Sequence, residues 1–226
     1  MNRRTLILGS LAAGLAVYAG GTWYVQDQRR KEALAEAARR AAEVPDLNSV
    51  LLRPGAASFG AEDAPVTLVE FFDPSCEACR AFHPVLTQLR TEFPDQLRIV
   101  MRYAAFHQGS DEAVAILEAA RRQNLFEPVL NALLESQPNW ALHDGPRMEI
   151  AWQIAEAQGL DISARDVELR SPGTVAILNR DRADIEVLGV RATPTFYLNG
   201  APLGQVSFES LSAAVRAAVQ ASAAGQ

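Results

Sequence analysis

Two cysteines separated by two residues, Cys76 and Cys79, constrain this chain more than any other feature. They are the only cysteines in its 226 residues. The apolar run 66–72 before them predicts a buried strand, and residues 76–91 follow a helical pattern. A C-x-x-C at a strand-to-helix turn places the first sulfur at a helix N-terminus, where the partial positive charge stabilises a thiolate. The motif therefore predicts a site for dithiol–disulfide exchange.

The two sulfurs are expected to have different roles. Cys76 is nearer the helix N-terminus and should be the more exposed and more acidic thiol, which makes it the candidate nucleophile. Cys79 lies one turn further in and is the candidate resolving thiol. A structural zinc site needs two more ligands, and the chain has no second cysteine pair. His83, four residues after Cys79, leaves a copper(I) site open as another use of the same sulfurs.

Two carboxylates near the motif are expected to modify its chemistry. Glu70 lies near the end of the predicted strand, where burial would raise its pKa and let it exchange a proton with the inner thiol. Glu77 and Ala78 form the dipeptide between the cysteines. The Glu77 carboxylate is expected to raise the pKa of Cys76 and make the pair less oxidising, unless it points to solvent and is screened.

A second signal lies far downstream, where Thr193-Pro194 precedes the apolar run 195–198. A Thr-Pro pair just before a strand is a candidate cis peptide bond. A cis-proline opposite the dithiol would leave the Thr193 backbone free to pair with a substrate strand. We therefore expect Thr193 and Pro194, together with Glu77 and Ala78, to contact the substrate.

The remaining pattern predicts an α/β fold. Strands are expected at 66–72, 97–103, 195–198 and 203–206, and helices at 76–91, 110–123, 126–136, 147–158, 174–188 and 208–221. Asn199-Gly200 predicts a tight hairpin turn between the last two strands, and Ser110 is the expected cap of its helix. This element order is that of a thioredoxin-type sheet with an inserted helical subdomain.

The N-terminal segment, residues 1–25, predicts export. Two arginines precede an uncharged, mainly apolar run of about 20 residues, which is long enough to span a bilayer. One interpretation is an uncleaved transmembrane anchor, favoured by Trp23 and Tyr24 at interfacial positions. The other is a signal peptide cleaved after Ala19. Residues 26–57 are expected to form a polar helical spacer and then a loop.

The combination of motifs resembles the DsbA-like family of thioredoxin-fold oxidoreductases. The resemblance covers about residues 58–220, with the helical insertion at about 109–173 and a short tail at 221–226. The matching segments are Gly60, residues 64–73, Cys76 and Cys79, Arg102-Tyr103, and Gly189-Val190 followed by Thr193-Pro194-Thr195-Phe196.

This resemblance implies thiol–disulfide exchange on exported proteins, with Cys76 attacking, Cys79 resolving, Glu70 as the buried acid and Pro194 in the cis form. It implies a periplasmic or extracytoplasmic protein, held in the inner membrane if the N-terminal segment is an anchor. The expected partners are cysteine-containing exported proteins and a membrane redox partner that recycles the dithiol. No cofactor or metal is expected beyond the redox-active disulfide, and the expected state is a monomer.

The net charge and two departures from the family pattern limit which partners and which direction of electron transfer are expected. A formal net charge of −6 argues against a nucleic-acid partner, which usually requires a basic face. The family's strong oxidants carry Pro-His between the cysteines and usually valine before the cis-proline, whereas this chain has Glu-Ala and Thr193. These differences leave an oxidase, a reductase for metalloprotein maturation and an isomerase open.

Overall fold

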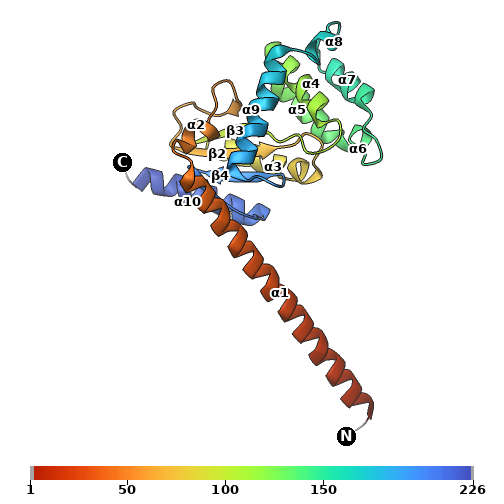
Figure 1. The fold of residues 1–226 in the computed structure, drawn as a ribbon, viewed down its shortest axis with the longest axis vertical. Helices are drawn as coiled ribbons and strands as arrows, with labels where there is room; N and C mark the ends of the chain where they lie inside the picture. The colour runs from red at the N-terminus through yellow and green to blue at the C-terminus, as the bar shows by residue number, and fades with distance from the viewer. Residues whose placement is uncertain (1–2, 225–226) are drawn as a thin grey trace.

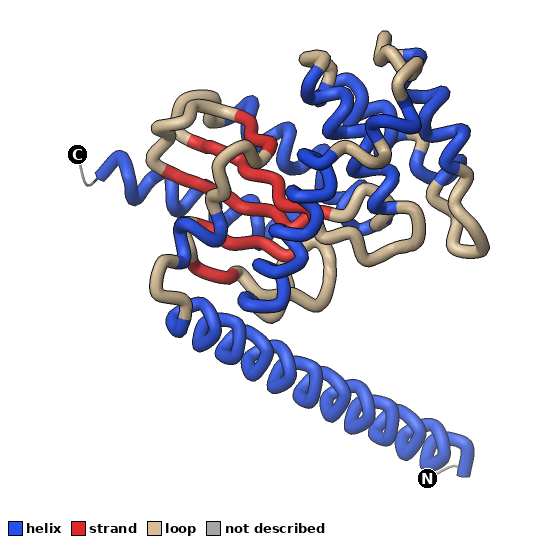
Figure 2. Tube along the Cα trace, turned by 45° about the horizontal axis from the view of Figure 1, so that its top comes forward, coloured by secondary structure: helices blue, strands red, loops and turns tan. Residues whose placement is uncertain are grey.

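A computed structural model describes residues 3–224 of the chain, without the side chains of residues 3–14 and 16. Within these residues a five-stranded sheet forms the centre of the molecule, with helices on both of its faces (Figures 1 and 2). In the order in which they lie side by side, the strands are β1 (Ala57–Phe59), β3 (Leu97–Tyr103), β2 (Val66–Phe72), β4 (Thr195–Leu198) and β5 (Ala201–Pro202). Strands β2 and β3 are parallel, and the other pairs are antiparallel.

The helices enclose this sheet and extend it on one side. They are α1 (Arg3–Glu43), α2 (Leu47–Leu51), α3 (Glu77–Glu92), α4 (Ser110–Arg122), α5 (Phe126–Glu135), α6 (Gln137–Trp140), α7 (Met148–Ala157), α8 (Arg165–Glu168), α9 (Pro172–Leu188) and α10 (Phe208–Ala224). The architecture confirms the predicted α/β thioredoxin-like fold with a helical insertion. Of the predicted tail, residues 221–224 continue α10, and residues 225–226 lie outside the described part.

The alternation along β2 decides which side chains meet which helices. Successive residues of a strand point to opposite faces, so Leu68 packs under α3 and α10 while Val69 and Phe71 pack against α9. Both faces are buried, as expected for a central parallel strand. Glu70 shares the face of Leu68, and the strand therefore places a carboxyl group beneath α3.

Helices α4 to α8 gather on one side of the sheet and form a core of their own (Figure 1). Trp140 and Trp152 are buried in it, and each indole N–H finds an acceptor. The same core includes Cys76 and Cys79. The dithiol therefore lies where the sheet-bearing part of the molecule meets the helical insertion.

Three local predictions were wrong. The strand expected at 203–206 is instead β5, because Asn199 and Gly200 both adopt positive φ and reverse the chain within two residues, so pairing resumes at Ala201. The loop expected after the helical spacer contains α2 and leads into the edge strand β1. Ser110 does not cap α4, whose N-cap residue is Gly109, because the Ser110 hydroxyl donates to Asp73 instead.

Helix α1 joins the predicted N-terminal segment and the predicted spacer into one helix. Its first half projects away from the domain, and its second half lies against the domain (Figure 1). There Ala41 is buried and Leu34 lies beside Gly204, so this part of the predicted helical spacer packs against the domain. Among the helices of the described residues, none combines the length and apolarity needed to cross a membrane. The predicted transmembrane anchor is therefore not supported, although the side chains of residues 1–14 lie outside the description.

Candidate redox site

The two cysteines occupy the start of α3 at different depths. Cys76 is the N-cap residue of α3, with extended backbone angles and a residual exposure of 7%. Cys79 lies inside the first turn and is 1% exposed. Both thiols are free. The Cys76 Sγ lies 3.3 Å from the backbone carbonyl of Thr193, and the Asp73 N–H points to the Cys79 Sγ at 3.5 Å. The Cys76 sulfur (the outer sulfur) thus faces the loop that contains Pro194, which we call the proline loop. The Cys79 sulfur (the inner sulfur) faces the sheet.

The environment of Cys76 stabilises its thiolate. Its pKa is lowered from 9.0 to about 5, chiefly by the hydrogen bond with Cys79, against the opposing effect of burial. A hydrogen bond from the Thr193 side chain and the backbone N–H groups of Ala78 and Cys79 lower it further. These N–H groups belong to the first turn of α3, where they lack partners within the helix. At neutral pH the outer sulfur is therefore a thiolate.

Of the two alternatives for Glu77, the structure supports the solvent-exposed, screened side chain. The Glu77 side chain is 68% exposed and lies 3.5 Å from His143. Its charge is consequently screened by water, whereas the hydrogen bonds to the Cys76 sulfur act at contact distance. Glu77 contributes little to the thiolate balance because it points away from the sulfur it follows.

Glu70 and Cys79 form the buried, proton-holding side of the site. Glu70 is 1% exposed, and desolvation, with the nearby Cys76 charge, raises its pKa from 4.5 to about 8. Burial likewise raises the pKa of Cys79, with smaller contributions from Cys76 and Glu70. Within the described residues Glu70 Oε1 has no hydrogen-bond partner, and it borders a cavity of about 20 Å³ that also touches His83. A cavity of this size holds about one water molecule.

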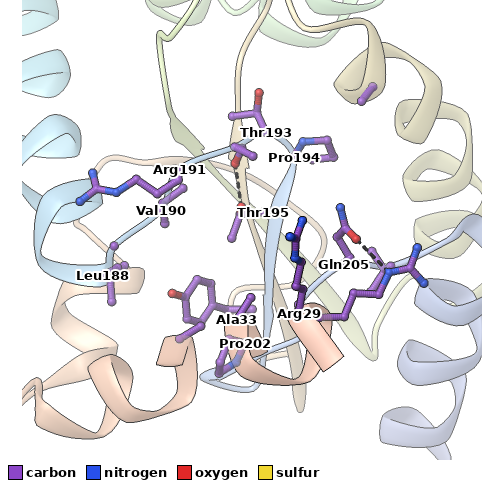
Figure 3. Close-up of a pocket in the computed structure, with 18 of the residues that line it drawn as sticks. Arg29, Ala33, Leu188, Val190, Arg191, Thr193, Pro194, Thr195, Pro202 and Gln205 are labelled. Carbon is purple, nitrogen blue, oxygen red and sulfur yellow. Dashed lines mark hydrogen bonds between the residues drawn. The ribbon is translucent and has the colours of Figure 1, made fainter. Parts of the chain in front are cut away.

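The proline loop faces the dithiol as the sequence predicts. The Thr193–Pro194 peptide bond is cis, and the Thr195 hydroxyl donates to the Ala192 carbonyl within the same loop at 2.7 Å. A groove of about 770 Å³ opens beside it, lined by Ala78, by residues 188–195 and by one side of α1 (Figure 3). The structure thus brings together Thr193, Pro194 and Ala78, while Glu77 does not line this groove.

Sequence reasoning assigned no role to Asp73, which organises the rear of the site. This fully buried carboxylate accepts hydrogen bonds from Ser75 N–H, from the Ser110 hydroxyl, and from the backbone N–H groups of Phe106 and His107. It also accepts one from His107 Nδ1 at 2.7 Å. Asp73 therefore ties the redox loop to the start of the helical insertion. Apart from Ser75, its partners lie 33 and more residues away, so only the fold reveals them.

His107 is the second residue whose role the sequence did not indicate. Partial burial acts to lower its pKa, but the bond to Asp73 and the charges of Asp73, Cys76 and Glu77 outweigh this, and the pKa is raised. The imidazolium is consequently favoured close to the Cys76 thiolate, from a loop distant in sequence. An attraction between the two charges stabilises both charged forms.

The structure does not place His83 as a third ligand for copper(I) beside Cys76 and Cys79. His83 Nε2 lies 2.7 Å from Asn131 Oδ1, and the ring borders the Glu70 cavity. In the part of the chain that the structure describes, no three His, Cys, Asp or Glu side chains are grouped so as to hold a metal ion. His83 therefore does not join the two sulfurs, as its spacing on the helix had suggested.

A C-x-x-C at the start of a helix, a cis-proline opposite it and a helical insertion define a thiol:disulfide oxidoreductase of the thioredoxin fold. Residues 53–217 match the family model described as thioredoxin, and the chain belongs to this family.

Known proteins of two kinds are similar to this chain. It is 35% identical over 141 residues to a Na(+)/H(+) antiporter NhaA of Herminiimonas arsenicoxydans, a match that covers 62% of this chain but 22% of the antiporter. It therefore spans less than a quarter of that relative. A putative protein-disulfide oxidoreductase of Rickettsia conorii is 25% identical, with 85% of this chain and 68% of the relative covered.

Two solved structures share the fold closely. A thioredoxin-like oxidoreductase from Silicibacter pomeroyi superimposes with a TM-score of 0.65 at 29% identity, covering 76% of this chain and 97% of the other. Wolbachia pipientis alpha-DsbA1 gives a TM-score of 0.70 at 16% identity, covering 80% and 98%. The second likeness, at this identity, concerns the fold alone.

Proposed function

We propose that this protein transfers disulfide bonds to exported proteins, and that its Cys76–Cys79 pair works in the oxidising direction. The observation that carries this direction is the lowering of the Cys76 pKa to about 5. A stabilised thiolate stabilises the reduced pair relative to the disulfide, and a pair whose reduced form is stabilised is a stronger oxidant. The reductase and isomerase alternatives lack a comparable observation.

The reaction begins from the Cys76–Cys79 disulfide. A client thiolate attacks the Cys76 sulfur, the Cys76–Cys79 bond breaks, and Cys79 leaves as a thiolate. A second client thiolate then attacks the client sulfur of the mixed disulfide, and Cys76 leaves as a thiolate. The client has lost two electrons and gained a disulfide, while the protein pair has been reduced. Cys76 carries the mixed disulfide in either direction because it is the sulfur nearer the surface.

Glu70 supplies the proton that this sequence of steps requires. The Cys79 thiolate released in the first step is buried, where its charged form is disfavoured. Glu70 is protonated at neutral pH because its pKa is about 8, and it lies on the same side of the sheet. Transfer of its proton to Cys79 makes the inner sulfur a better leaving group. In the reverse direction the carboxylate accepts the proton and restores the nucleophile.

The N-terminal segment indicates the compartment of this activity, and the electrons gained by the cysteine pair imply a recycling partner. Two arginines followed by an apolar segment support export, which places the dithiol outside the cytoplasm. Each client oxidation leaves the pair reduced, so turnover needs a partner that accepts two electrons from Cys76 and Cys79. We propose that a membrane redox protein is this partner.

The reduction potential of the full-length protein, equilibrated in glutathione buffers, tests the direction. A value near −120 mV is expected, since this is roughly the potential of a strong disulfide donor. A value near −270 mV, roughly that of a thioredoxin-like reductant, would overturn the oxidising direction. It would favour the alternative in which the protein keeps exported thiols reduced for metalloprotein maturation.

A further inference from the structure

We infer that the groove beside the proline loop binds client segments that carry acidic residues near the reactive cysteine, and that helix α1 supplies its selectivity. This inference rests on the proposed function, because it names the substrate class of the same dithiol. It concerns residues of α1 that lie outside the segment matched by the family model, which begins at residue 53.

The groove adjoins the reactive sulfur at one end. Thr193, which lines it, is the hydrogen-bond partner of Cys76, and Ala78 and Phe82 of α3 line it as well. Its volume of about 770 Å³ lies within the range of pockets that bind ligands of substantial size. A client segment that presents its cysteine to Cys76 therefore has room to continue into the groove.

One side of the groove is apolar and suits an extended backbone. Pro194, Tyr197, Pro202 and Val206 line this part, and Pro194 and Pro202 lack a backbone N–H. An apolar lining of this kind can contact many different client side chains and discriminates poorly between them. Selectivity must come from the polar groups placed around it.

The charged groups among them are all cationic. Arg29, Arg30 and Arg191 line the groove, and none of its lining residues is an aspartate or glutamate. This contrasts with the net charge of −6 for the whole chain. A concave site lined by one sign of charge attracts ligands of the opposite sign.

The three arginines differ in how they are held. Arg30 donates to Gln205 Oε1 at 3.1 Å, which fixes its guanidinium at the groove margin. Arg191 lies 3.5 Å from Glu186 and extends away from the proline loop (Figure 3). Arg29 forms no ion pair with any described residue, and its side chain points toward Pro194 and Thr195 (Figure 3). Arg29 and Arg30 are therefore the cations available to a carboxylate in the groove.

The test uses full-length oxidised protein and synthetic peptides with one cysteine. Each peptide carries one test residue, placed two, four or six residues before or after that cysteine. The three peptide sets differ only in whether the test residue is Asp, Asn or Lys. Rate constants for mixed-disulfide formation are measured at low and high salt, each relative to dithiothreitol, which is uncharged and too small to occupy the groove. The variants are Arg29→Gln with Arg30→Gln, and Arg39→Gln as control, since Arg39 is an exposed arginine of the same helix that does not line the groove.

At low salt the wild-type protein is expected to react roughly fivefold faster with the best Asp peptide than with its Asn counterpart, and the Lys peptide slowest. High salt and the double variant should each remove this preference, whereas Arg39→Gln should retain it. Equal rates for Asp and Asn peptides at every position, or an undiminished preference in the double variant, would overturn the inference. Failure of the proposed function is distinguishable, because the reduction potential decides the oxidising direction, and the ratio of rates for Asp and Asn peptides does not depend on it.

Discussion

The Cys76 sulfur lies 3.3 Å from the backbone carbonyl oxygen of Thr193, the residue before the cis-proline. This contact joins segments 117 residues apart in the chain. It places the outer sulfur directly beside the backbone that lines the groove. The proposed exchange reaction and the proposed client contact therefore meet at one point of the fold.

The two cysteines should respond differently to serine. Cys76→Ser is expected to abolish exchange, because Cys79 is buried and no client sulfur reaches it. Cys79→Ser should retain attack by the Cys76 thiolate but lose the resolving thiol, so mixed disulfides with clients accumulate. Non-reducing electrophoresis of cell extracts followed by mass spectrometry measures them. If Cys79→Ser traps no client protein, the assignment of Cys76 as the attacking sulfur is contradicted.

Titration of the Cys76 thiolate should depend on His107. The ultraviolet absorbance of the reduced protein should show a thiol midpoint near pH 5. His107→Gln removes a cation favoured near the sulfur, so the midpoint is expected to rise. His143→Gln serves as the control, since the His143–Glu77 pair is exposed on both sides and screened. Equal midpoints in all three proteins would show that His107 does not act on Cys76.

Glu70→Gln should remove a pH dependence of stability. Burial raises the pKa of Glu70 from 4.5 to about 8, so the folded state binds this proton more tightly than the unfolded chain. The resulting stability is fully present below about pH 4.5 and is lost as pH rises through 8. Between about pH 4 and 7, the free energy of unfolding of the wild type should fall relative to the variant by roughly 3 kcal/mol.

Urea unfolding of the two reduced proteins at both pH values measures this difference. The comparison cancels the other titrating groups, which both proteins share. A constant offset between them would mean that Glu70 ionises normally and cannot hold the proton for Cys79.

Asp73→Asn should loosen the junction between the redox loop and the helical insertion. The amide provides one acceptor oxygen where the buried carboxylate provides two, and its NH₂ group would face the donors of Phe106 and His107. We expect a loss of about 2–4 kcal/mol in the free energy of unfolding. Asp111→Asn, at an exposed position in the first turn of α4, is the matched control and should change stability little. Equal stabilities of the two variants would contradict the structural role of Asp73.

The sequence predicted the central elements well because their signals are local. Strands β2, β3 and β4 begin and end at the predicted residues, since each is a dense apolar run with clear turn residues at its ends. Strands β1 and β5 are short edge strands, and β1 exists only because β3 offers it an open edge. Nothing within residues 57–59 indicates this partner.

The candidate site was predictable to the same extent. Cys76, Cys79 and Pro194 follow from motifs within a few residues, and the burial of Glu70 follows from its place in a strand covered on both faces. Asp73 and His107 could not be found, because their interaction arises from the packing of distant loops. Two alternatives stayed open for Glu77, because its place in the sequence gives its proximity to Cys76 but not the exposure of its side chain.

Helix α1 runs without interruption from its N-terminal half, which projects away from the domain, to the residues that line the groove (Figure 1). At about 1.5 Å per residue, the helical part before Gln26 is roughly 35 Å long. No loop separates this part from the groove, so a rotation of the helix at its N-terminal end would change the position of Arg29 and Arg30 relative to the proline loop.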